Sequence, residues 1–351
     1  MSESKKAGKA KWIVLSLSLI VLSLEILKRT TSFADFYGYH IYPYLAKTMH
    51  ALSSLIPVSL YDLFVTLILI IILVVIYLLI KRAWNRALFL FLGLLLSVFL
   101  FFQLSWGLNY FKSDFFHRNQ ISYPQNDSIV FKKFATHFID SLNKNFPYQF
   151  HVDTLLVLTE AEKGYQNLSD KFNYINVRGE VFSKRMIYNK FYSSVGVYGY
   201  YGPFFAEVHV NADLKKHQYP AVLTHEIAHL NGITSEAEAN LYAYLICSKS
   251  IDSTSRFSGY YSIFPYVISN ARSFLSEYDY KQLIDQINPR ILDLYKNTHS
   301  YWDSLYSPQI GKIQNVIYDI YLKNNNIPSG KKNYSEVISM ILSVDSIYPI
   351  P

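Results

Sequence analysis

Three long apolar runs lie within the first 106 residues and restrict the folds that the chain can adopt. They cover about residues 12–28, 60–80 and 87–104. A bilayer core of about 30 Å needs roughly 20 apolar residues in a helix, and the three runs are near or above that length. We therefore predict a membrane region with three transmembrane helices in residues 1–106, with the lipid bilayer as a partner.

The first apolar run has an alternative interpretation as a cleaved signal peptide. Such peptides end in a cleavage site of the small-x-small type. No such site closely follows Leu27, and two further apolar runs come after it. We therefore expect the first helix to be retained.

Basic residues predict the orientation of these helices. One group precedes the first run and another fills the link between the second and third runs: Lys5, Lys6, Lys9, Lys11, Lys81, Arg82 and Arg86. The positive-inside rule places both groups in the cytoplasm. Three spans then put residues 107–351 outside the cytoplasm, although Lys28, Arg29 and Lys47 in the expected outer loop weigh slightly against this orientation.

Charge and cysteine content characterise the remainder of the chain, residues 107–351. The whole chain has 33 basic residues (Lys and Arg) and 26 acidic residues (Asp and Glu). Residues 1–106 hold 10 of the basic and 4 of the acidic residues, so residues 107–351 hold 23 basic and 22 acidic residues. This nearly neutral region has no basic patch that would favour nucleic acid. Cys247 is the single cysteine, so no intrachain disulfide is available and the domain must depend on its apolar core.

Among the features of the sequence, the motif His225-Glu226-Ile227-Ala228-His229 is the most specific indication of a chemical function. Two histidines four residues apart project from one face of a helix, so both imidazoles can bind one metal ion. A glutamate directly after the first histidine lies close enough to deprotonate a water at that metal. The motif predicts a catalytic Zn²⁺ site with His225 and His229 as ligands and Glu226 as the general base.

Signals around the motif predict two helices joined by a tight turn. Pro220 suits the first turn of a helix, and Asn231-Gly232 ends that helix, because both residues tolerate the left-handed conformation. Ser235 is then the expected N-cap of a second helix, with Glu238 at the third position of a capping box. This turn brings the start of the second helix back towards the histidines.

Glu236 is the candidate third zinc ligand, at the start of the second helix. Glu238 is the competitor, but the capping box already gives it a structural role. The alternative role for Glu236 is an acidic residue favoured by the helix dipole. Asn240, one turn further on, would orient a ligand of the same site or lie on the helix surface. A metzincin site fits less well, because Ser235 stands where that class has its third ligand.

A short β section is expected at about residues 181–211, before the metal-binding helix. Its last part, Phe205–Asn211, alternates as a strand does. We expect an edge strand there, which could bind a peptide by strand addition; Glu207 or His209 would then touch the substrate or face solvent. The soluble domain as a whole is predicted to be mainly α-helical, with an α+β, zincin-like fold.

Several segments resemble those of a known family. They are Pro57–Asp62, Trp106–Tyr110, His225–His229, Glu236–Asn240 and Phe257–Tyr261. Together with the three N-terminal spans, they look like the bacterial membrane-protein family called domain of unknown function 3810. The resemblance covers nearly the whole chain. It implies a zincin-like metallopeptidase in the bacterial inner (cytoplasmic) membrane, which by the orientation above has its catalytic domain on the periplasmic side.

The segment from Glu236 to Asn240 is also similar to the Glu-x-x-Ala-Asp/Asn segment that supplies the glutamate ligand in gluzincins, including ImmA/IrrE-like peptidases. This similarity favours Glu236 over Glu238 as the ligand. Asn240 stands where many gluzincins have an acid, and the interval from His229 to Glu236 is shorter than in those proteins.

The sequence therefore predicts a membrane-anchored, zinc-dependent metallopeptidase that hydrolyses a peptide or protein substrate. The alternative is a non-catalytic zincin-like sensor, or a binding or assembly protein, with a structural or vestigial metal site. Structural zinc sites have four protein ligands and no use for a base such as Glu226, so catalysis is favoured. Tyr260 and Tyr261 are candidates to stabilise the oxyanion. The sequence specifies neither a substrate nor an oligomeric state.

Overall fold

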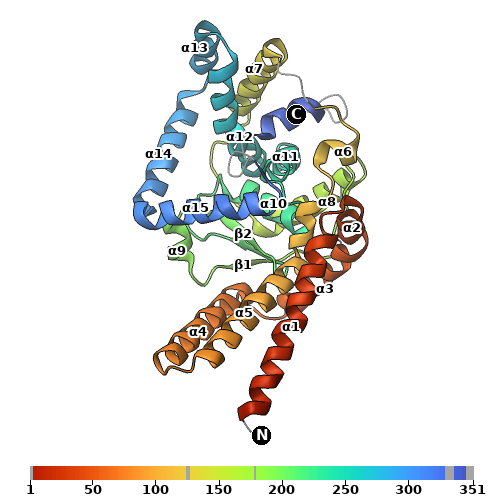
Figure 1. The fold of residues 1–351 in the computed structure, drawn as a ribbon. Helices are drawn as coiled ribbons and strands as arrows, with labels where there is room; N and C mark the ends of the chain where they lie inside the picture. The colour runs from red at the N-terminus through yellow and green to blue at the C-terminus, as the bar shows by residue number, and fades with distance from the viewer. Residues whose placement is uncertain (1–2, 124–126, 178, 329–335, 345–351) are drawn as a thin grey trace. The chain divides into compact units, whose positions relative to one another are not determined.

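The computed structural model describes residues 3–123, 127–177, 179–328 and 336–344, and the chain divides into two compact units (Figure 1). Unit 1 comprises Met1–Ser113 and Gly202–Glu207, and unit 2 comprises Asp114–Tyr201 and Val208–Pro351. The described residues are mostly helical, with one small three-stranded sheet, as predicted.

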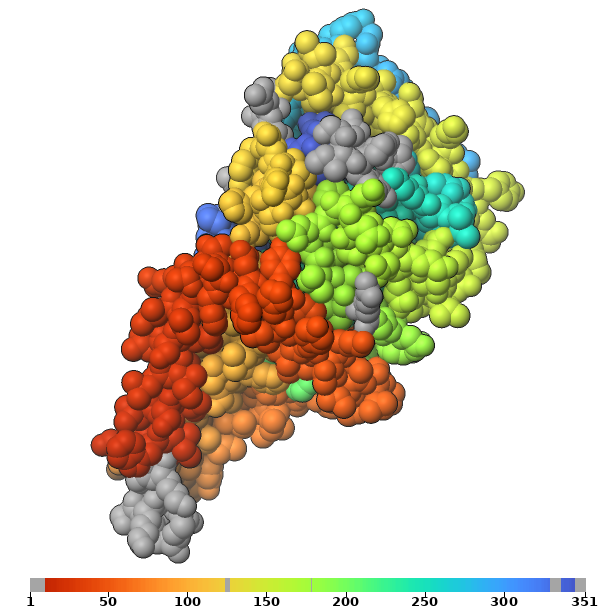
Figure 2. All heavy atoms as spheres, turned by 90° about the vertical axis from the view of Figure 1, so that its right-hand side faces the viewer, coloured from red at the N-terminus to blue at the C-terminus, as the bar shows by residue number. Residues whose placement is uncertain are grey.

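Three helices of unit 1 are long and apolar enough to cross a membrane. They are α1 (Glu3–Leu27, with the apolar part starting at Ala10), α4 (Leu60–Ile80) and α5 (Trp84–Ser105). Only 6%, 6% and 11% of their most apolar segments are buried within the protein, and α1, red in Figure 2, lies on the surface of unit 1. Exposed apolar surface of this extent fits association with lipid. The three predicted helices are therefore confirmed, with ends within a few residues of those expected.

The connection between α1 and α4, expected only as an outer loop, is helical. It contains α2 (Thr31–Phe36), the π-helical turn η1 (Tyr37–Ile41) and α3 (Tyr42–Ser54), and the 3₁₀ turn η2 (Gly107–Phe111) follows α5. The Tyr37 hydroxyl donates a hydrogen bond to the Leu104 carbonyl (2.7 Å). Asp35 accepts hydrogen bonds from the backbone N–H and the hydroxyl of Ser113 (2.8 and 2.7 Å). These bonds attach the connection to the end of α5 and to the residue pair that follows η2.

Unit 1 also contains Gly202–Glu207, a segment that lies far along the chain. The Glu207 carboxylate accepts hydrogen bonds from the backbone N–H groups of Leu60 (3.1 Å) and Tyr61 (2.9 Å) at the start of α4. These N–H groups have no partner inside the helix, so a carboxylate stabilises them. Glu207 is 1% exposed. The expectation that it touches substrate or faces solvent is wrong, because its buried carboxylate caps α4.

The small sheet contains β1 (Ser183–Arg185), β2 (Gly199–Gly202) and β3 (Glu207–Val210) in the order β1-β3-β2. β1 and β3 are parallel, with Lys184 opposite His209. The strand before the helix that carries His225 and His229 is therefore central, and the prediction of an edge strand there is wrong. His209 is fully buried, and its ring stacks on Tyr200 with centroids 4.3 Å apart, so it does not face solvent. The edge strands are β1 and β2.

Unit 2 consists mainly of helices, and α11 lies at the centre of its core. Its helices are α6 (Phe115–Asn119), α7 (Ser128–Lys144), α8 (Thr154–Ser169), α9 (Asn189–Ser194), α10 (Tyr219–Leu230), α11 (Glu236–Cys247), α12 (Ser253–Phe274), α13 (Glu277–Asp285), α14 (Pro289–Leu305), α15 (Pro308–Asn324) and α16 (Val337–Val344). Every residue of α11 except Asn240 is buried, and α8, α10, α12 and α16 contact it. Burial raises the pKa of the Cys247 thiol to about 12, so this cysteine acts as a small apolar residue.

Candidate metal centre

The two helices of the motif form where local signals predicted them. Pro220 lies in the first turn of α10. After Leu230, Gly232 adopts φ 78°, and the N–H groups of Gly232 and Ile233 bond to the carbonyls of His229 (2.9 Å) and Ala228 (3.1 Å). This pattern is a Schellman motif, which ends a helix and reverses the chain. The reversal places the first residue of α11 beside the last turn of α10.

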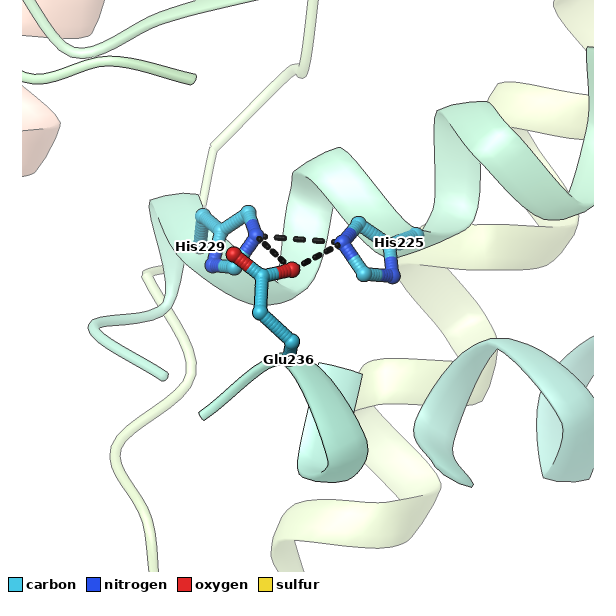
Figure 3. A group of neighbouring side chains, drawn as sticks. All are labelled: His225, His229 and Glu236. Atoms are coloured by element: carbon cyan, nitrogen blue, oxygen red, sulfur yellow. Dashed lines mark hydrogen bonds and ion pairs between the residues drawn. The ribbon is translucent and has the colours of Figure 1, made fainter. Parts of the chain in front are cut away.

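Three side chains converge at this reversal, as Figure 3 shows. His225 Nε2 lies 3.1 Å from Glu236 Oε2, His229 Nε2 lies 3.6 Å from the same oxygen, and the two Nε2 atoms are 3.1 Å apart. Tetrahedral zinc with bonds of about 2.0–2.1 Å holds neighbouring ligand atoms about 3.3–3.4 Å apart. The three atoms therefore form one face of a tetrahedron of the size that Zn²⁺ requires.

The other nitrogen of each imidazole is held by a hydrogen-bond acceptor. His229 Nδ1 donates to the carbonyl of Ile233 (2.7 Å), and His225 Nδ1 lies 2.9 Å from Asn240 Oδ1. A proton on each Nδ1 leaves each Nε2 lone pair free to bind a metal, which is the arrangement seen around metal-bound histidines. Asn240 lies where the prediction of a ligand-orienting residue requires it.

The ionisable groups of the cluster shift one another's pKa. Burial raises the pKa of Glu226 to about 7, although His225 and His229 oppose this rise. Burial also disfavours a charge on His229, but Glu236 outweighs it and raises the pKa of that histidine to about 9. Against the effect of burial, His229 and the hydrogen bonds from both histidines hold the pKa of Glu236 well below its usual range. In the metal-free site a proton on His229 thus balances the charge of the Glu236 carboxylate.

The side chain of Glu226 extends from α10 to the edge strand β2. It is 5% exposed, and its Oε2 has no hydrogen-bond partner among the residues that the structure describes. A Cβ atom added to Gly199 would lie 2.7 Å from Glu226 Oε1 and 2.9 Å from Val222 Cγ1. Only glycine allows the strand to approach the carboxylate this closely. Gly199 was not predicted as a site residue, because the Tyr-Gly run around it is typical of loops and hairpin turns.

Glu238 has a structural role, but only part of the expected one. Ser235 caps α11, and its hydroxyl accepts a hydrogen bond from the Glu238 N–H (3.3 Å). The Glu238 carboxylate forms a buried ion pair with Arg118 of α6. No sequence pattern pointed to Arg118, which precedes Glu238 by 120 residues.

Two tyrosines expected near the reacting atoms pack elsewhere. The ring of Tyr260 lies against Phe138 and Tyr244, and that of Tyr261 lies against His217. Tyr318 of α15, in contrast, does reach the cluster, because its hydroxyl lies 2.6 Å from Glu236 Oε1. Tyr318 was also missed, because no local pattern connects it to the motif.

Comparison with known proteins gives one family. The family described as "protein of unknown function (DUF3810)" matches residues 37–342. This match includes α4, α5 and all of the candidate metal ligands. No curated protein and no solved structure matches the chain.

Proposed function

The chain belongs to the DUF3810 family, whose function is unknown, and from its own site we propose that it is a membrane-anchored, zinc-dependent metallopeptidase. The observation that carries the proposal is the meeting of His225, His229 and Glu236, with ligand atoms within 4.8 Å of one another. Glu226 lies on the same helix with a buried carboxylate oxygen that lacks a partner among the described residues. A site with three protein ligands and a neighbouring base suits hydrolysis better than structural metal binding.

In the proposed hydrolysis, different residues bind the metal, transfer the proton and orient the imidazoles. A zinc ion bound by His225, His229 and Glu236 would polarise the scissile carbonyl and acidify a water at the open position. Glu226 accepts a proton from the attacking water and delivers it to the leaving amine. Asn240 and the Ile233 carbonyl keep both imidazoles in the orientation and tautomer that binding requires.

We further propose that the enzyme lies in a bacterial inner membrane with unit 2 on the extracytoplasmic side. This orientation follows from the basic residues around the first span and between the second and third spans. Its substrates would then be peptides or proteins accessible from that side of the membrane. The almost balanced charge of residues 107–351 provides no basis for a nucleic-acid partner.

Zinc content provides the direct test. The full-length chain, purified in detergent, is expected to bind about one zinc per chain. His229→Ala should lower zinc affinity by more than the roughly 10- to 100-fold cost of losing a residue that merely orients a ligand. His299→Ala is the control, because that side chain is 65% exposed on α14. Wild-type protein without zinc, or equal zinc affinity in both variants, would contradict the proposed metal site.

Gly199→Ala is expected to lower activity while zinc content stays unchanged. The new methyl group would meet the Glu226 carboxylate at 2.7 Å, so either the base or the strand must shift. A displacement of about 1 Å near reacting groups can cost on the order of 100-fold in rate. The kcat of peptide cleavage measures the effect, with Gly93→Ala as the control, since a Cβ there meets no atom within 4 Å. An unchanged kcat for Gly199→Ala would show that the position of Glu226 is unimportant.

A further inference from the structure

The C-terminal half of α15 reaches the candidate metal centre through Tyr318. This residue follows Glu236 by 82 positions, and its hydroxyl lies 2.6 Å from Glu236 Oε1. The tyrosine hydroxyl donates this hydrogen bond, and the carboxylate oxygen accepts it. The distance falls within the range of about 2.5–2.7 Å for a hydroxyl that donates to an anion.

Because of this bond, the two carboxylate oxygens of Glu236 have different neighbours. Oε2 lies 3.1 Å from His225 Nε2 and 3.6 Å from His229 Nε2, where a shared metal would bind. Oε1 accepts the hydrogen bond from Tyr318. A carboxylate can bind a metal through one oxygen or through both. A donor on Oε1 competes with the metal for that oxygen and favours binding through Oε2 alone.

We propose that Tyr318 is a positioning residue that keeps Glu236 a one-oxygen metal ligand. The inference rests on the metallopeptidase proposed above and deepens it. A second carboxylate oxygen on the metal would occupy the position that a catalytic site leaves open for water. By holding Oε1, Tyr318 would keep the fourth metal position free for water, although its own side chain does not contact that position.

The packing of α15 makes this bond important for the helix as well. Among its 17 residues only Gly311 and Leu322 are buried, and its aliphatic side chains Ile313, Val316 and Ile317 are more than 60% exposed. A helix with so little buried apolar surface gains a large share of its anchoring from polar contacts. Because binding energies are reciprocal, a metal that fixes Glu236 also strengthens the attachment of α15.

The test compares Tyr318→Phe with Tyr321→Phe in the full-length protein. The ring of Tyr321 stacks on that of Tyr318, with centroids 6.0 Å apart, so the control removes a neighbouring hydroxyl and keeps the bond to Glu236. Zinc affinity, measured by competition with a chelator, should fall about 10- to 100-fold in Tyr318→Phe. It should remain at the wild-type value in Tyr321→Phe.

Cobalt substitution gives a readout that a purely structural role would not change. Co²⁺ in wild type and in Tyr321→Phe should show the strong visible absorption of a four-coordinate site, and Tyr318→Phe the weaker absorption of higher coordination. If wild type binds neither zinc nor cobalt, the proposed function itself fails. If wild type binds both metals, and Tyr318→Phe has the same zinc affinity and the same spectrum, only the role of Tyr318 is overturned.

Discussion

Replacing Glu226 with glutamine is expected to reduce peptide hydrolysis by about 10²- to 10⁴-fold, the usual contribution of a general base. Glutamine has nearly the same shape but cannot accept a proton from the attacking water. The three candidate ligand atoms belong to other residues, so zinc content should stay at the wild-type level. The buried carboxylate has a pKa raised to about 7 by burial, so removing its charge should not destabilise the fold.

Because no substrate is known, the assay must identify a cleaved peptide as well as measure the rate of its hydrolysis. Purified full-length protein can be incubated with a complex peptide mixture, and new termini can be identified by mass spectrometry. Glu277→Gln, in the exposed first turn of α13, is a matched control that should cleave as wild type does. Full activity in Glu226→Gln would assign the base elsewhere. Zinc bound by wild type without any cleavage would favour the alternative of a structural site in a sensor or assembly protein.

The pH dependence of cleavage has a defined sign. Glu226 acts as a base only when it is ionised, so activity should rise with pH as the carboxyl loses its proton. Its pKa is about 7 in the metal-free site, and a bound dication lowers the pKa of a neighbouring carboxyl. The rising limb should therefore lie below pH 7, and it should be absent from any residual activity of Glu226→Gln.

The part of the site that could be predicted from sequence is the part encoded locally. Histidines four residues apart must share a helix face, and Gly232 and Ser235 specify how one helix ends and the next begins. These signals bring His225, His229 and Glu236 together, because the intervening turn has few conformations available. The three apolar helices were predictable for the same reason, since span length depends only on local composition.

The missed residues contact the site across long stretches of chain. Gly199, Arg118 and Tyr318 come from a strand and two helices that carry no motif, and their roles exist only after folding. The error at β3 has a different cause. Glu207 and His209 are polar residues at alternate positions, a pattern typical of a solvent-facing edge. Here both are buried, since Glu207 caps α4 and His209 stacks on Tyr200.

Replacing Arg118 with methionine is expected to lower the free energy of unfolding by about 3–5 kcal/mol, the cost of breaking a buried ion pair from one side. The Glu238 side chain is 2% exposed and that of Arg118 is 9% exposed, so the lone carboxylate could not be solvated. Arg118 Nε also donates to the Asn173 carbonyl (3.0 Å). For a domain of this size the loss corresponds to a fall of about 6–20 °C in Tm.

The double variant Arg118→Met/Glu238→Gln distinguishes the cost of an unpaired buried charge from the cost of altered side-chain packing. Removing both charges leaves no uncompensated ion, so most of the Tm should return. Lys132→Met, which breaks the partly exposed pair with Asp279, should change Tm far less, because solvent screens that pair. The outcome bears on the metal site, since Glu238 lies in the same turn as Glu236. If Arg118→Met leaves Tm unchanged, Glu238 is not committed to an ion pair, and the choice of Glu236 as the metal ligand loses one of its supports.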